Sequence, residues 1–180
     1  MKFLTILLFL PVFAAPEFAD DLKKVTDHFE CDPLCIFNHS EITSSTIGFF
    51  PKCERVCGVL IFNENLDLEE EDIKEAFSSM IVLHGGITVE KTQLRSLNLF
   101  NVDNMFDEFS IFCETYGVFI KNNAKLQNID TVLKFYLYGN DDGYECDFRI
   151  EYNEQLNVNI LNAPSVLHYD VRANWNLGDS

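Results

Sequence analysis

Residues 85–97 read GGITVEKTQLRSL, and this stretch decides the fold class. Two glycines open it, and from Ile87 to Glu90 apolar and polar residues alternate, which is the period of a half-buried β-strand. Leucines follow at positions 94 and 97 after a polar corner. A short strand, a tight corner and returning leucines are typical of one turn of a stacked repeat.

The same pattern occurs three more times, at residues 58–66 (GVLIFNENL), 117–126 (GVFIKNNAKL) and 148–156 (FRIEYNEQL). The first apolar positions of the copies are 59, 87, 118 and 148, so the copies lie 28, 31 and 30 residues apart. A fixed period of this length predicts a solenoid, in which only stacking of neighbouring repeats buries their apolar sides. A β-sandwich with evenly spaced strands is the alternative.

Alternation within each copy predicts which side chains face the core: Val59/Ile61, Ile87/Val89, Val118/Ile120 and Phe148/Ile150. The outward residues then form two rows across the strands and are the candidate ligand-binding face: Leu60, Thr88, Phe119 and Arg149 in one row, and Phe62, Glu90, Lys121 and Glu151 in the other. Apolar and aromatic residues beside charges on an exposed surface favour protein recognition. The alternative is that the N-terminal segment or loops cover these residues.

The N-terminal residues have the order of a secretory signal. A lysine at position 2 precedes an apolar run over residues 3–13, and Ala14 and Ala15 follow it. The run is shorter than the roughly 20 apolar residues that span a bilayer. We therefore expect a signal peptide over residues 1–14 and a secreted, extracellular protein with no membrane span.

In that compartment six cysteines predict three disulfides, with the candidates Cys31, Cys35, Cys53, Cys57, Cys113 and Cys146. The last two are 33 positions apart, close to one repeat, so a bridge between neighbouring turns is expected. The first four are expected to pair across the segments 31–35 and 53–57, and the sequence leaves the partners open. A four-cysteine zinc site is the alternative, although such sites favour closer spacing and reducing compartments. The sequon Asn38-His39-Ser40 predicts a glycan on Asn38 at the surface.

The charge and the motifs narrow the function classes. The chain is 47% hydrophobic and carries a formal charge of −16, so it can bury a core and would be repelled by nucleic acid. No nucleophile, zinc or phosphate-loop motif is present, and we expect no enzyme activity, no metal and no cofactor.

One helix is expected after Asp67 as its N-cap, with Ile73, Ala76, Phe77 and Met80 buried.

Three blocks, at residues 57–61, 85–97 and 116–123, resemble the receptor L domain, the ligand-binding module of insulin-receptor and EGF-receptor ectodomains. The resemblance covers about residues 53–160. It implies a right-handed β-helix of four to five rungs, similar to a leucine-rich-repeat solenoid, with short helices on one side. It also implies a module without catalytic activity. The chain departs from the family's receptors, which carry two L domains, a cysteine-rich region, a membrane span and a kinase.

The expected organisation is a signal peptide (1–14), an N-terminal disulfide-linked cap (15–56), an L-domain-like solenoid (57–160) and a C-terminal tail (161–180). The expected function is binding of an extracellular polypeptide, such as an insulin-like or growth-factor-like ligand or a receptor, through the open sheet face. The alternative is a secreted carrier of a small apolar ligand, of the lipocalin type. That class would need an early Gly-x-Trp, and the single tryptophan is Trp175.

Overall fold

The computed structural model describes residues 16–100, 109–139, 146–156 and 171–174. The expected signal peptide lies outside these ranges. Of the expected C-terminal tail, residues 171–174 are described, and they form a strand.

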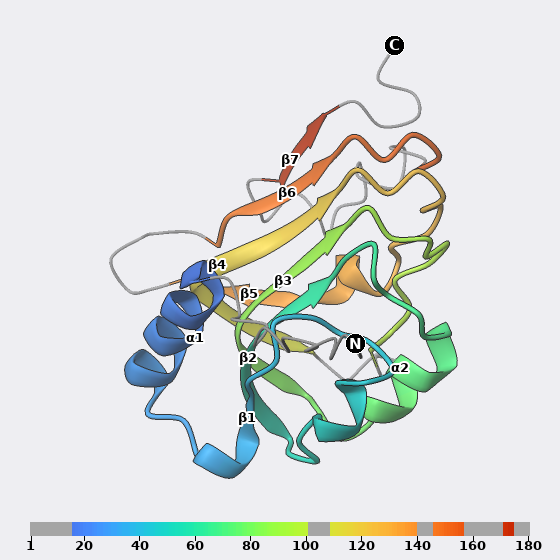
Figure 1. Cartoon of the computed structure of the whole chain (residues 1–180). Helices are drawn as coiled ribbons and strands as arrows, with labels where there is room; N and C mark the ends of the chain where they lie inside the picture. Colours follow the sequence, from blue (N-terminus) through green and yellow to red (C-terminus); the bar gives the residue numbers. More distant parts are fainter. Residues whose placement is uncertain (1–15, 101–108, 140–145, 157–170, 175–180) are drawn as a thin grey trace, which may run out of the picture.

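A parallel sheet dominates the described residues (Figure 1). Its strands follow the order β1-β2-β3-β4-β6-β7, and β5 pairs with the first half of β4. Every pairing is parallel, and the strands are β1 (Ile36–Phe37), β2 (Arg55–Phe62), β3 (Val82–Glu90), β4 (Ser110–Lys121), β5 (Tyr136–Tyr138), β6 (Phe148–Glu151) and β7 (Val171–Asn174). The helices are α1 (Pro16–Phe29) and α2 (Glu70–Ala76), with 3-10 turns at Pro33–Cys35, Ile47–Phe49 and Val132–Lys134. The expected mostly β fold with short helices is confirmed at this level.

The register corrects the alignment of the first copy by one residue. Gly58 pairs with Gly85, the first of the two glycines, whereas the spacing of the internal copies predicts a pairing with Gly86. Leu60 therefore lies beside Ile87, and Val118 and Phe148 continue that row on β4 and β6. A shift of one residue moves every side chain of a strand to the other face. The expected outward positions of Leu60 and Phe62 are wrong, because both are fully buried in the core.

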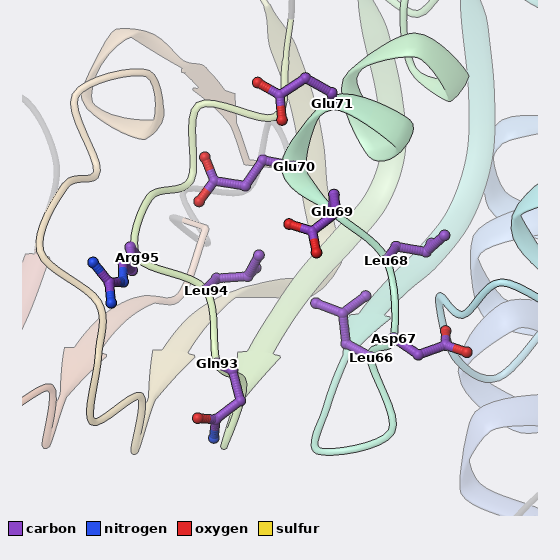
Figure 2. Close-up of a pocket in the computed structure, with 9 residues that line it drawn as sticks. All are labelled: Leu66, Asp67, Leu68, Glu69, Glu70, Glu71, Gln93, Leu94 and Arg95. Atoms are coloured by element: carbon purple, nitrogen blue, oxygen red, sulfur yellow. The ribbon is translucent and has the colours of Figure 1, made fainter.

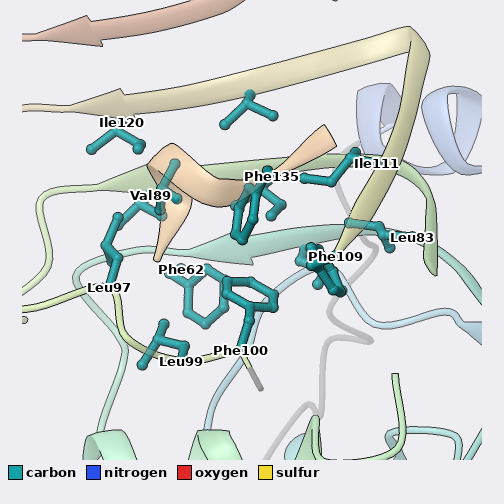
Figure 3. Packing of buried hydrophobic residues seen from close by; sticks show 14 of the residues in the cluster. Phe62, Leu83, Val89, Leu97, Leu99, Phe100, Phe109, Ile111, Ile120 and Phe135 are labelled. Carbon is teal, nitrogen blue, oxygen red and sulfur yellow. The ribbon is translucent and has the colours of Figure 1, made fainter. Parts of the chain in front are cut away.

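Phenylalanine rings fill the interior behind the sheet (Figure 3). Phe100 lies at the centre, with ring centroids 4.7 Å from Phe109, 5.0 Å from Phe135 and 5.5 Å from Phe77. Phe77 follows α2 and brings that helix onto the core, together with the fully buried Ile73. Each buried ring of this size stabilises the fold by about 2–3 kcal/mol through removal of apolar surface from water.

The corner that follows the strands is held by a buried ladder of polar side chains. The Asn123 carboxamide oxygen accepts from both the backbone N–H (3.0 Å) and the hydroxyl (2.9 Å) of Thr92 on the preceding turn. Its NH₂ group donates to the Val89 carbonyl at 2.9 Å and to the Asn153 side chain of the next turn at 3.0 Å. Asn153 in turn donates to the Ile120 carbonyl at 3.0 Å. Both asparagines are fully buried, so the ladder satisfies backbone groups that water cannot reach.

The residues that directly precede Thr92, Asn123 and Asn153 of this ladder have a left-handed backbone. The φ angles are 56° at Lys91, 58° at Asn122 and 57° at Tyr152. Asparagine tolerates this region, whereas lysine and tyrosine pay about 1–2 kcal/mol there. Asn122 thus forms a left-handed corner, while its neighbour in sequence, Asn123, belongs to the buried ladder.

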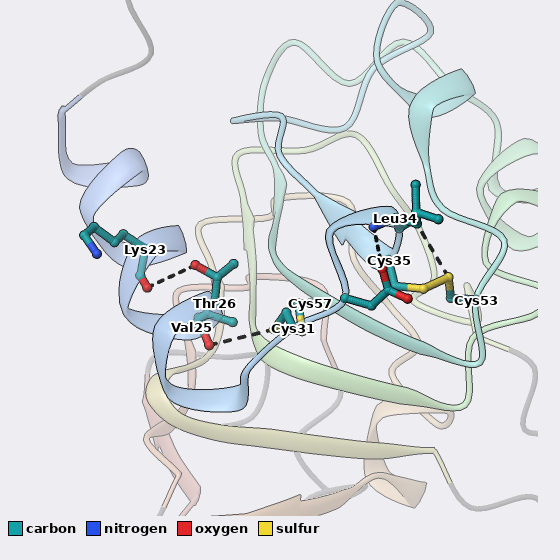
Figure 4. Close-up of a disulfide and its surroundings, with 9 residues drawn as sticks. Lys23, Val25, Thr26, Cys31, Leu34, Cys35, Cys53 and Cys57 are labelled. Carbon is teal, nitrogen blue, oxygen red and sulfur yellow. Dashed lines mark hydrogen bonds between the residues drawn. A yellow bond between two sulfur atoms is a disulfide. The ribbon is translucent and has the colours of Figure 1, made fainter.

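All six cysteines are paired. Cys31, just after α1, is joined to Cys57 on β2, and Cys35 is joined to Cys53 (Figure 4). These two bonds cross between the segments as expected and resolve the connectivity. The third bond, Cys113–Cys146, joins β4 to the segment before β6 as the spacing predicts. Bridges that close loops of this length stabilise a fold by about 2–4 kcal/mol each.

The acidic start of α2 differs from the expectation in its capping residue. Glu69 is the N-cap, and the Asp72 carboxylate accepts from its backbone N–H at 3.3 Å. Asp67 instead accepts from the backbone N–H and the hydroxyl of Ser44, and these hydrogen bonds lower the pKa of Asp67. The helix therefore begins two residues later, and Asp67 fastens the N-terminal cap to the turn after β2.

Replacement of Asn123 by alanine is expected to destabilise the fold by about 3 kcal/mol, because it removes the buried carboxamide oxygen to which the Thr92 N–H and hydroxyl both donate. Urea unfolding checks this. Lys125→Ala, an exposed change on the same corner, is the control and should stay near the wild-type midpoint. An Asn123→Ala variant as stable as that control would contradict the role given to the ladder.

Lys91→Gly is expected to stabilise the protein by about 0.5–1 kcal/mol, since glycine adopts the left-handed backbone without strain. Lys91→Ala shortens the side chain without relieving the strain and is the matched control. Thermal unfolding should show a raised Tm for the glycine variant alone. An equal Tm in both variants would show that this corner is unstrained.

Candidate functional site

The outer face of the sheet carries the candidate site. The register places Ile61, Thr88, Phe119 and Arg149 side by side on β2, β3, β4 and β6. A second row, Glu90, Lys121 and Glu151, follows two residues later on the last three of these strands. Six of the eight expected face residues are therefore brought together, and Ile61 takes the position that had been given to Leu60.

Phe119 is the centre of this face. It is half-buried, and two cations lie over its ring: the Lys121 ammonium 5.1 Å from the centroid and the Arg149 guanidinium carbon at 5.8 Å. Asp147 fixes the guanidinium by accepting from Arg149 Nε at 2.8 Å and from Nη2 at 2.5 Å. Cations held over an aromatic face contribute about 0.5–1 kcal/mol each at such exposed sites. The face therefore presents an accessible ring in a fixed, charged frame.

Helix α1 covers part of the same face. This helix was not predicted from the sequence. Phe18 and Val25 are buried against Cys57 and Val59 of β2, and Leu22 packs with them. These positions repeat at the helical spacing that buries one side, a signal that was present in residues 16–29. The outer face is thus divided into a part under α1 and an open part beside it. None of the eight expected face residues belongs to the cluster that α1 forms with β2.

A wide bulge in β4 places Tyr116 on this face. His84 pairs with Phe112 and Gly86 with Gly117, so β4 holds three more residues than β3 over this interval. The Tyr116 hydroxyl lies 3.0 Å from the Thr88 hydroxyl. Burial raises the pKa of Tyr116, and the negative charges of Asp21, Glu17 and Glu90 raise it further, while the Thr88 hydrogen bond lowers it. The alternation of apolar and polar residues along the strands gives no indication of a register irregularity of this size.

A groove of about 510 Å³ opens between α1, the loop after β1 and the uncovered part of the face. Apolar side chains and hydroxyl groups form its floor, and carboxylates line its walls. The lining residues are Glu17, Phe18, Asp21, Ser40, Glu41, Val59, Ile61, Asn63, Thr88, Glu90, Tyr116, Phe119 and Lys121. We call this the α1 groove.

A second hollow, of about 430 Å³, lies between the start of α2 and the segment after β3 (Figure 2). Two of its carboxylates serve the fold. Glu70 accepts from the Ser96 backbone N–H at 3.1 Å, and Asp67 binds Ser44 as described above. Among the residues that the structure describes, no group of three or more histidine, cysteine or acidic side chains is arranged to hold a metal ion.

The enclosed space found in the described part of the core is too small for a carried ligand. The space enclosed by Phe62, Leu99 and Phe135 measures about 10 Å³, which is the size of one water molecule. Small-molecule sites are typically hundreds of Å³. This part of the interior gives no support to the alternative of an apolar-ligand carrier.

Asn38 is exposed in the turn after β1, as a glycan acceptor requires. No helix in the described part of the chain is long and apolar enough to cross a membrane. No family model matches the chain, and a search of curated proteins finds no similar sequence.

Gly86→Ala is expected to destabilise the protein by about 3 kcal/mol and to displace Tyr116. A Cβ at this position would lie 2.2 Å from the Gly117 carbonyl oxygen and 2.5 Å from a Tyr116 ring carbon. Gly48→Ala, where nothing lies within 4 Å, is the matched control and should be neutral. Urea midpoints and tyrosine fluorescence report the two effects. A Gly86→Ala variant with the properties of the control would contradict the close packing of Tyr116 on β3.

Proposed function

We propose that this chain is a secreted, non-catalytic binding module, built as a right-handed β-helix like a receptor L domain, that recognises an extracellular polypeptide through the outer face of its sheet. The observation that carries the proposal is the fixed, accessible row formed by Thr88, Phe119 and Arg149. Aromatic and arginine side chains are the residues that most often dominate protein–protein binding energy.

Two features support the architecture in this proposal. Paired residues on successive long strands lie about 30 positions apart: Ile87 beside Val118, and Val118 beside Phe148. The same corner, with a left-handed residue followed by a buried polar side chain, closes each of these turns. Parallel strands that repeat at this interval are what a coiled solenoid requires.

Secretion is supported by the three disulfides, since such bonds form and persist in oxidising compartments. They also support a binding role, because two of them anchor α1 and the N-terminal cap beside the face. A rigid face loses little conformational entropy when it binds a partner.

The test is affinity capture from extracellular fluid with the immobilised secreted protein, followed by mass spectrometry of what is retained. Phe119→Ser is expected to lose a polypeptide that the wild type retains, by tenfold or more, which corresponds to about 1.4 kcal/mol. Phe49→Ser is the matched control, because Phe49 is 67% exposed and lies outside the face.

Circular dichroism and secretion yield should be the same for both variants. Retention of the same polypeptides by the wild type and by Phe119→Ser would contradict the proposal. A wild type that retains nothing beyond the bare matrix would contradict it as well.

A further inference from the structure

We infer that the α1 groove takes the cationic side chain of a basic polypeptide segment, a lysine or an arginine, with its aliphatic stem on the apolar floor and its charged head among the groove's carboxylates. This inference rests on the proposed function and adds to it the chemistry of the partner.

The floor of the groove suits an aliphatic stem. Val59 and Ile61 come from β2, and Phe119 lies two strands away on the same face. Lysine and arginine side chains bury their methylene stems on such surfaces and keep the charged end in a polar setting. The paired hydroxyls of Thr88 and Tyr116 lie beside this floor and offer oxygen acceptors.

The walls carry an excess of negative charge. Four carboxylates line the groove, from Glu17, Asp21, Glu41 and Glu90, against one cation, Lys121. The Lys121 ammonium is directed over the Phe119 ring. The excess of carboxylates makes the potential inside the groove negative. Burial is the main cause of the raised pKa of Tyr116, and three of these carboxylates, Asp21, Glu17 and Glu90, raise it further.

Side-chain amides hold two of the carboxylates through hydrogen bonds. An amide is neutral, so it does not cancel the negative charge of the carboxylate. Glu41 accepts from the side-chain amides of Asn63 and Asn65 at 3.1 and 2.9 Å. Glu90 accepts from the Asn122 amide at 3.1 Å, and the Lys91 ammonium lies 3.9 Å from the same carboxylate at the surface. Asp21 is bound on one oxygen by Lys24. A pre-positioned anionic wall gives charge-assisted hydrogen bonds without reorganisation.

The net charge of the chain acts in the same direction. A protein with a formal charge of −16 attracts basic polypeptides over long range and repels acidic ones. Helix α1 shows that this face already accommodates an amphipathic segment, since Phe18, Leu22 and Val25 lie against it. A basic segment lying beside α1 would extend the same mode of packing.

The test uses two short synthetic peptides of leucine and serine that differ only at the central residue, arginine in one and its neutral analogue citrulline in the other. Binding to the full secreted protein is followed by fluorescence anisotropy and by amide NMR shifts. We expect the arginine peptide to bind about tenfold more tightly than the citrulline peptide, with shifts at Ile61, Thr88 and Phe119. The preference should shrink as salt is raised, because the carboxylates lie at the surface.

Three variants locate the effect. Glu17→Gln/Asp21→Asn should remove the preference for arginine, Phe119→Ser should weaken both peptides, and Glu71→Gln on α2, the matched control, should leave binding unchanged. Equal binding of the two peptides by the wild type, or no binding of the arginine peptide at about 1 mM, would overturn the inference.

Other outcomes separate this inference from the proposed function. Loss of binding in Phe119→Ser with an unchanged arginine preference in the double variant overturns the inference and keeps the polypeptide-binding face. Binding that neither variant affects overturns both. Self-association of the unliganded protein that the double variant abolishes would assign the groove to a second copy of the chain and overturn the inference.

Discussion

The buried hydrogen bonds at the corners after β3, β4 and β6 are the constraint on which the rest of the structure depends. A chain that turns inside an apolar interior leaves backbone groups that water cannot reach. Asn123 solves this for two turns at once, because it accepts from Thr92 behind it and donates to Asn153 ahead of it. A side chain that bonds both neighbours also fixes how each turn is aligned on the next. Polar groups therefore help to hold β3, β4 and β6 in register, while the phenylalanine core contributes the burial of apolar surface.

The register of the strands also decides which side chains lie next to one another on the outer face. Because the turns are in register, Thr88, Phe119 and Arg149 form a straight row, and Lys121 and Arg149 can both reach the same ring. Helix α1, tied to β2 by the Cys31–Cys57 bond, then limits which part of the face stays open. The groove with its acidic walls lies at the boundary between the covered and the open part. In the function that we propose, the shape that α1 leaves and the charge around it select the partner.

The sequence predicts the strands and the disulfide pattern well, and it fails where tertiary packing decides. The alternation after Gly86, Gly117 and at Phe148 identifies three strands with the correct inward residues. The first copy is misaligned by one position because two adjacent glycines offer two equally good matches for Gly58. That error moved Leu60 and Phe62 onto the wrong face.

Other features of the site have weaker signals. The bulge that carries Tyr116 leaves no mark in an alternating pattern, since its length is set by the packing of β4 against β3. Asn122 and Asn123 are the same residue type at adjacent positions, yet only Asn122 has the left-handed backbone. The role of Asn123 and Asn153 as ladder residues becomes visible only when the corners after β4 and β6 lie side by side.

Hydrogen exchange of individual side-chain and backbone amides, followed by NMR, tests the corner ladder most directly. We predict that the Asn123 and Asn153 side-chain amides and the Thr92 backbone amide exchange only on global unfolding, because all three are buried and hydrogen-bonded. The exposed Asn122 side chain, one residue away, should exchange rapidly and serves as the internal reference. Exchange of the Asn123 amide as fast as that of Asn122 would contradict the central role of the ladder.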